Sequence, residues 1–187
     1  MKNIFIGMLL IFFNFNINIG NATIGLIPSF IGYSYMLKGV LELQDFSNRF
    51  VTIAPFVKIM AMLHLCIYVA NLFGISTEVF YPFDLNSYTI LVFAMALFLT
   101  GSGLYISYYI IMGIKDIESA EERDLNTGSL YSIWKITVLL WLVAYLALPM
   151  PFIAGIAIAV QFVVGVCYLL AFNTAKNLFY ATKSLNE

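Results

Sequence analysis

The sequence predicts an all-α fold: an integral membrane bundle of six helices, arranged as three hairpins, with the N- and C-termini in the cytoplasm. Three observations lead to this prediction. The chain of 187 residues is 62% hydrophobic and only 10% charged, whereas soluble domains carry about 25% charged residues. Its apolar residues fall into six runs of roughly bilayer-spanning length. All of its positively charged residues fall on one side of the resulting six-span arrangement.

The six apolar runs define the predicted spans, because a membrane-crossing helix needs about 20 mostly apolar residues. They cover 4–19, 22–43, 51–73, 86–114, 130–148 and 151–180. The first run is short, and the fourth is longer than a bilayer needs, so we expect the fourth to tilt or to project. Pro149 and Pro151 mark the turn between the last two runs. No low-complexity linker separates the runs, so residues 1–187 are predicted to form one transmembrane domain.

The predicted orientation rests on the positively charged residues. They occupy the N-terminus, two junctions between runs and the C-terminal tail: Lys2, Lys38, Arg49, Lys58, Lys115, Arg123, Lys135, Lys176 and Lys183. The other three junctions contain neither Lys nor Arg. Because cytoplasmic loops are enriched in Lys and Arg, both termini are predicted to be cytoplasmic. Lys2 and the apolar residues 4–13 are also similar to a signal peptide, but no small-residue cleavage site follows, so an uncleaved first helix is favoured.

Composition and motifs disfavour several classes of function. The net charge of −1 provides no basic field for nucleic acid. Cys66 and Cys167 lie in apolar runs, and no metal or redox motif is present. No span carries Asp or Glu at its centre, as ion-coupled pumps usually do. Thr100–Gly103 is similar to the serine loop of rhomboid-type proteases, but Thr100 replaces a glycine and His64 precedes the serine. We therefore expect neither enzyme activity nor a cofactor.

Asparagines are concentrated where the first apolar run ends, in the stretch FNFNINIGNATIG at 13–25. In a helix, Asn14, Asn18 and Asn21 would share one face. In a strand, Asn14, Asn16 and Asn18 would alternate with Phe15 and Ile17. Pro28 allows a broken, re-entrant start to the second helix. In either geometry the amides lie near the outer leaflet, where they either join helices by hydrogen bonds or line a ligand-facing cavity.

Three of the predicted spans carry a polar stripe at helical spacing. The stripes are His64, Tyr68 and Asn71; Thr100, Gly103 and Ser107; and Gln161, Gly165 and Tyr168. Counting from the helix ends puts the first member of each stripe, His64, Thr100 and Gln161, at a similar depth. This predicts a polar pocket at the midplane of the bilayer. The residues predicted to bind a ligand are His64, Thr100, Gln161, Asn14, Asn18 and Asn71. The plainer interpretation is a neutral imidazole hydrogen bonded to one neighbouring side chain.

A resemblance covers about the first quarter of the chain. It rests on Ile27-Pro28-Ser29-Phe30-Ile31-Gly32-Tyr33, on Lys38-Gly39-Val40 and Glu42-Leu43, and on the upstream Ile17-Asn18-Ile19. These stretches resemble a loose group of small uncharacterised multi-pass membrane proteins of low-GC Gram-positive bacteria. Ser29 stands where that group usually has Asp. The resemblance implies a location in the bacterial plasma membrane and implies no activity.

Two further stretches have predicted structural roles. Gly101-Ser102-Gly103 and Gly155-x-x-x-Ala159 carry small residues, which allow helix backbones to approach closely. The stretch 115–124 carries five acids and two bases. It is predicted to be a solvated extension of the fourth helix that ends near 126–128.

Three classes of function remain open. Binding or transport of a small molecule through an outward-facing polar pocket is favoured. In size and orientation the chain resembles the vitamin-binding subunits of energy-coupling-factor importers, although it lacks their Ala-x-x-x-Ala motif in the first helix. The alternative is a non-enzymatic accessory or regulatory subunit that packs against another membrane protein. A membrane enzyme is disfavoured because no catalytic constellation is visible. The expected partners are the lipid bilayer and either a small molecule or a membrane protein.

Overall fold

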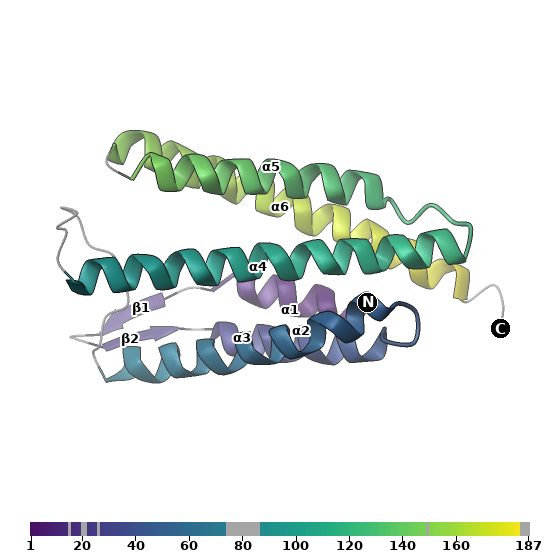
Figure 1. Ribbon diagram of the computed structural model, residues 1–187, viewed down its shortest axis with the longest axis horizontal. Helices are drawn as coiled ribbons and strands as arrows, with labels where there is room; N and C mark the ends of the chain where they lie inside the picture. The colour runs from purple at the N-terminus through teal and green to yellow at the C-terminus, as the bar shows by residue number, and fades with distance from the viewer. Residues whose placement is uncertain (15, 20–21, 26, 74–86, 149, 184–187) are drawn as a thin grey trace.

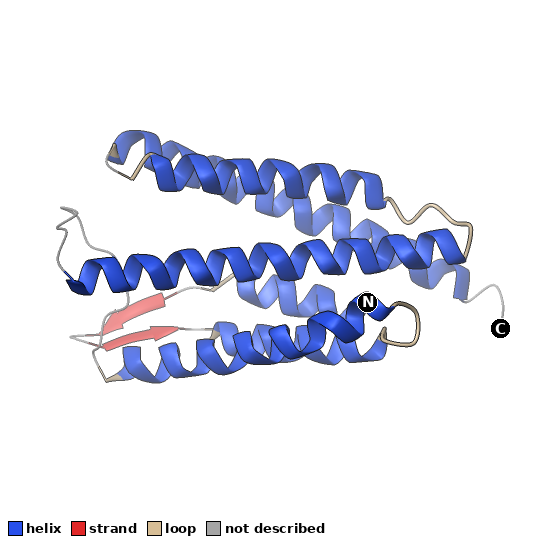
Figure 2. Ribbon diagram, in the orientation of Figure 1, coloured by secondary structure: helices blue, strands red, loops and turns tan. Residues whose placement is uncertain are grey.

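The computed structural model describes residues 1–14, 16–19, 22–25, 27–73, 87–148 and 150–183. Within these residues the chain forms six helices and one short hairpin (Figures 1 and 2). In chain order the elements are α1 (Lys2–Phe12), β1 (Asn16–Ile19), β2 (Ala22–Gly25), α2 (Ser29–Glu42), α3 (Asn48–Leu72), α4 (Ser87–Ala120), α5 (Thr127–Leu146) and α6 (Pro151–Lys183). The fold is therefore predominantly helical, as the apolar runs predicted.

Four helices are long and apolar enough to cross a membrane. They are α3 over Asn48–Leu72, α4 over Ile90–Ala120, α5 over Thr127–Leu146 and α6 over Phe152–Ala181. α1 is a shorter apolar helix of 11 residues, and α2 has 14 residues. Large apolar side chains on the long helices point away from the rest of the molecule, for example Leu91, Leu146 and Phe152, which are 67%, 74% and 80% exposed. Such surfaces are typical of helices that face lipid.

The asparagine-rich stretch is an extended hairpin, so the helices predicted over 4–19 and 22–43 are both too long. α1 ends at Phe12, and α2 begins at Ser29. Between them β1 and β2 pair in antiparallel register, with Asn18 opposite Thr23. The alternation of polar and apolar residues at period two favours a strand over a helix, and Pro28 keeps the preceding residue out of the helical region. The predicted turn at Gly20 and Asn21 lies outside the described residues.

Glycines bring α1 and α2 into close contact. A Cβ atom at Gly7 would lie 2.5 Å from the carbonyl oxygen of Gly32, and one at Gly39 would lie 2.5 Å from the amide nitrogen of Ile4. No side chain fits at either position without moving a backbone. The core beside this contact is formed by buried apolar side chains of α1 to α4 and α6: Ile4, Met36, Val40, Phe50, Ile53, Val57, Ile110, Ile114 and Phe172. The tight glycine contact thus holds the two short helices in the bundle.

One end of the bundle carries the start of α1, the α2–α3 turn, the α4–α5 connection and the end of α6 (Figure 1). We call it the basic end, because Lys2, Arg49, Lys115 and Arg123 lie in or beside these segments. The backbone amide of Lys2 donates to the Tyr180 hydroxyl at 3.3 Å, which joins the start of α1 to the last turns of α6. The β1–β2 hairpin lies toward the opposite end (Figure 2).

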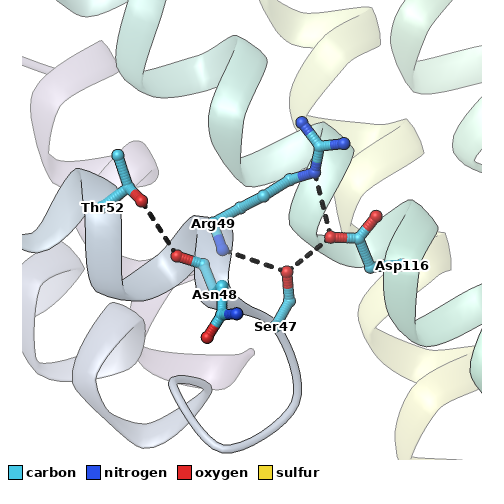
Figure 3. A network of polar contacts seen from close by, with 5 residues as sticks. All are labelled: Ser47, Asn48, Arg49, Thr52 and Asp116. Atoms are coloured by element: carbon cyan, nitrogen blue, oxygen red, sulfur yellow. Dashed lines mark hydrogen bonds and ion pairs between the residues drawn. The ribbon is translucent and has the colours of Figure 1, made fainter.

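A polar network at the basic end joins α3 to α4 (Figure 3). Ser47 is the N-cap of α3: its hydroxyl accepts from the Arg49 amide at 3.2 Å and donates to Asp116 Oδ2 at 2.5 Å. Arg49 Nε donates to the same carboxylate oxygen at 2.9 Å. One carboxylate on α4 therefore fixes both the cap and the first turn of α3.

The acidic stretch after Lys115 has a structural role that its charge alone did not reveal. The helical extension predicted to end near 126–128 ends instead at Ala120, and Asn126 is the N-cap of α5. The Glu118 carboxylate accepts from the Leu125 amide at 3.0 Å, from the Thr127 amide at 3.3 Å and from the Thr127 hydroxyl at 2.8 Å. Glu118 thus satisfies backbone donors at the start of α5, where helices leave them unpaired.

Candidate central polar site

Two buried polar atoms of α6 have no hydrogen bond partner among the described residues. They are Gln161 Oε1 and the Tyr168 hydroxyl oxygen. Seven residues separate them, so they lie on the same face of α6, about 10 Å apart along its axis. Gly165 lies on that face between them. A buried polar atom without a partner destabilises a fold by about 1–3 kcal/mol. Stability alone therefore does not explain why these two polar atoms are buried on α6.

Ser107 of α4 faces the Tyr168 end of this pair. The Tyr168 hydroxyl is close enough to Ser107 to interact with its side chain, although the two groups do not have the geometry of a full hydrogen bond. Ser107 gives its hydrogen to the Gly103 carbonyl of its own helix at 2.8 Å, so its free lone pairs can only accept. Because α4 and α6 run in the same direction (Figure 1), Thr100 and Gln161, each seven residues before this contact, lie at a similar depth.

His64 joins the group through Tyr33 of α2. The Tyr33 and His64 rings stack with centroids 4.8 Å apart and an interplanar angle of 21°. A Cβ at Gly103 would lie 3.9 Å from the Tyr33 hydroxyl oxygen, so this phenol also reaches α4. Tyr33 is 6% exposed. These contacts join His64 to Tyr33 and place Tyr168 near Ser107. Gln161 lies two turns before Tyr168 on the same face of α6. We call His64, Tyr33, Ser107, Gln161 and Tyr168 together the central polar cluster.

Thr100 faces a different neighbour. Its hydroxyl forms a hydrogen bond with the Tyr145 hydroxyl of α5 at 2.7 Å, and the Tyr145 hydroxyl reaches the Ala96 carbonyl at 3.2 Å. Thr100 therefore joins α4 to α5 and does not point toward His64. Trp134 of α5 makes a comparable link by donating to the Leu104 carbonyl at 3.1 Å.

The three predicted asparagines lie nearer the hairpin end. The Asn14 amide donates to the Ser29 hydroxyl at 2.8 Å and so joins the end of α1 to the start of α2. This contact matches the interhelical role among the two that the sequence left open. Asn18 lies in β1, where the structure describes its backbone pairing alone. Asn71 lies in the last turn of α3.

Phe12, the last residue of α1, covers the face of α6 between the two unpartnered atoms. Its ring stacks on Phe162 with centroids 5.2 Å apart. A Cβ at Gly165 would clash with the Phe12 ring. The ring therefore fills the notch that the glycine leaves. Helical spacing did not identify Phe12, because its sequence context is that of any apolar residue in a membrane run, and it assigned Tyr33 no role in the site.

The surroundings of the cluster carry no formal charge. Stretches without Asp, Glu, Lys or Arg make up much of the helices around the cluster: 3–12, 59–72, 87–114, 136–146 and 151–175. Within the described ranges no group of three His, Cys, Asp or Glu residues could hold a metal ion. Cys66 and Cys167 are free and exposed. The chemistry available at the cluster is therefore hydrogen bonding and ring contact.

Comparisons with protein-family models, with curated proteins and with solved structures find no match for this chain. The functional argument accordingly rests on the geometry of the site itself.

Proposed function

We propose that this chain is a multi-pass plasma-membrane protein of bacteria that crosses the bilayer six times, keeps both termini in the cytoplasm, and binds or transports a small molecule through an outward-facing polar pocket. The central polar cluster forms the inner wall of this pocket, and the hairpin end forms its mouth. The protein acts without enzymatic chemistry of its own.

The combined length of α1 and β1 supports six crossings, because it is enough for the first of them. α1 rises about 16 Å over its 11 residues, and the four residues of β1 add about 13 Å. Their sum is close to the hydrocarbon thickness of about 30 Å. Strand backbone at that depth is tolerated where it faces protein or water, and β1 pairs with β2. The clustering of Lys and Arg toward the basic end supports a cytoplasmic location for that end.

One observation carries the binding proposal: Gln161 Oε1 and the Tyr168 hydroxyl are buried on one face of α6 without a hydrogen bond partner in the described chain. A chain selected for stability alone would use apolar side chains at these two positions. A ligand that hydrogen bonds to them would recover the lost stability on binding. The pair is therefore best explained as part of a site that is completed by another molecule.

Native mass spectrometry tests this proposal on the full-length protein released into nanodiscs from its own membrane. We compare the wild type with Gln161→Leu, and we use Gln44→Leu as the matched control because Gln44, the only other glutamine, lies in the α2–α3 turn. We expect a small bound mass on the wild type and the control that is lost from Gln161→Leu. Bare protein in all three samples would contradict the proposal.

The accessory role is the second candidate, and it has an observation of its own. Gly155 is exposed, and a Cβ built there meets nothing within 4 Å. Ala159, one turn further along α6, is also exposed. The predicted close-packing motif is therefore not used against another described helix of this chain. A stoichiometric polypeptide partner in the same mass spectra, without a small ligand, would favour this role.

A further inference from the structure

We propose that the central polar cluster takes a neutral, ring-bearing molecule that donates an N–H or O–H hydrogen bond to Gln161 Oε1, and that this molecule displaces the Phe12 ring from the Gly165 notch. The inference rests on the proposed small-molecule function and specifies the chemical class of the ligand. It draws on three features of the site: the absence of charge, the hydrogen-bonding direction of Gln161 and the position of Phe12.

The absence of charged residues on α4 and α6 favours a neutral ligand. No Asp, Glu, Lys or Arg lies on α6 between Pro151 and Ala175, or on α4 between Ser87 and Ile114. An ion moved from water into a medium of low dielectric constant without a partner loses many kcal/mol of solvation. No formal charge on these two helices compensates that loss, and His64, which is ionisable, lies on α3 and stacks on Tyr33. A neutral ligand avoids this cost.

The Gln161 oxygen sets the direction of the hydrogen bond. A side-chain amide oxygen can only accept, and Oε1 is the buried atom of Gln161 without a partner. A ligand must therefore supply a donor at this position. At the other end of the face, the Tyr168 phenol can donate or accept, whereas Ser107 has used its hydrogen on the Gly103 carbonyl. Recognition thus begins with one obligatory donor on the ligand.

Phe12 explains both the shape of the ligand and its entry. The ring occupies the space above Gly165, on the face between Gln161 and Tyr168, and stacks on Phe162. A planar ring of similar size therefore fits the same notch. Phe12 is also the last residue of α1, and Asn14 follows it before the hairpin. The proposed displacement requires the Phe12 ring to move, whereas the close contact between α1 and α2 is made at Gly7, Gly32 and Gly39.

Three probes that share one ring separate these requirements. The compound 4-fluorobenzyl alcohol is neutral and carries a donor, its methyl ether is neutral and lacks the donor, and 4-fluorobenzylammonium carries a donor and a positive charge. We measure saturable binding of each by fluorine NMR to the full-length protein in nanodiscs, and empty nanodiscs correct for partition into lipid. We expect saturable binding of the alcohol alone.

Variants connect the probe to the site. Gln161→Leu should weaken binding of the alcohol about tenfold, because one hydrogen bond is lost. Phe12→Ala should tighten binding about tenfold, because the site no longer has to expel a ring. Phe98→Ala is the matched control, since Phe98 is 57% exposed on α4, and it should leave the affinity unchanged.

The possible results separate this inference from the proposed function. If the ether or the ammonium compound binds as tightly as the alcohol, the ligand class is wrong, while loss of that binding in Gln161→Leu would still support a site at the cluster. If none of the probes binds saturably, the ligand class is also wrong, and the bound mass in native spectra decides the proposed function. Unchanged affinity in Phe12→Ala would overturn the displacement of the ring.

Discussion

Two acidic side chains at the basic end of the bundle, Asp116 and Glu118, accept several hydrogen bonds each, whereas two buried polar atoms in the central polar cluster have no partner among the described residues. Asp116 accepts from Ser47 and Arg49, and Glu118 accepts three hydrogen bonds at the start of α5. Gln161 Oε1 and the Tyr168 hydroxyl accept none from described residues. The same chain can therefore build complete networks. Polar groups at the basic end thus stabilise the fold, and we propose that those at the centre serve a ligand.

The largest expected effect is at Glu118. Glu118→Ala removes three hydrogen bonds and leaves the Leu125 and Thr127 amides without this acceptor. We expect the free energy of unfolding to fall by about 2 kcal/mol, measured by titration from mild detergent into SDS. Glu121→Ala is the control, because Glu121 makes only a 3.6 Å contact with Arg123. Equal losses in the two variants would contradict the assigned capping role.

A smaller loss is expected at Asp116. Asp116→Ala removes the acceptor shared by Ser47 and Arg49 (Figure 3). Both partners of the ion pair are about 40% exposed, so solvent screens the pair and we expect a loss of only about 1 kcal/mol. Asp116→Asn keeps an acceptor for Ser47 and should therefore recover part of the lost free energy of unfolding. Asp45→Ala, at an exposed acid of the α2–α3 turn, should leave the SDS midpoint unchanged. If Asp116→Asn is no more stable than Asp116→Ala, the Ser47 hydrogen bond has no measurable role.

In the central polar cluster, we expect a substitution to raise the free energy of unfolding. Tyr168→Phe removes a buried hydroxyl that has no described partner, so we expect the ligand-free protein to gain about 1 kcal/mol of unfolding free energy. Tyr35→Phe is the matched control, because Tyr35 is 42% exposed on α2. A loss of stability in Tyr168→Phe beyond that of the control would mean that the hydroxyl stabilises the folded protein.

Sequence periodicity predicted much of the helical fold. The run at 51–73 corresponds to α3 over Asn48–Leu72, and the runs at 130–148 and 151–180 correspond to α5 and α6 within a few residues. These helices are recognisable because their apolar residues are continuous over a bilayer length. The asparagine-rich stretch was ambiguous, because the same residues fit one helical face and one strand face. In the structure, residues 16–19 pair with 22–25 as strands. Such pairing cannot be predicted from the sequence of one segment alone.

The candidate site was predictable in part for the same reason. Helical spacing identified the stripes that contain His64 and Gln161, because side chains seven residues apart share a face. Spacing does not say which neighbour that face meets. Thr100 meets Tyr145 of α5, a consequence of how α4 is rotated about its axis. Tyr33 and Phe12 were missed because aromatic residues in an apolar run look like core or lipid contacts.

The most direct test of the central claim measures both properties of Gln161→Leu in one preparation: the unfolding free energy of the ligand-free protein in SDS and the small mass retained in native spectra. We predict that stability rises by about 1 kcal/mol relative to the wild type and that the bound mass is lost, with Gln44→Leu unchanged in both. Lower stability together with an unchanged bound mass would contradict the account, because Gln161 would then stabilise the helix bundle and have no role in binding.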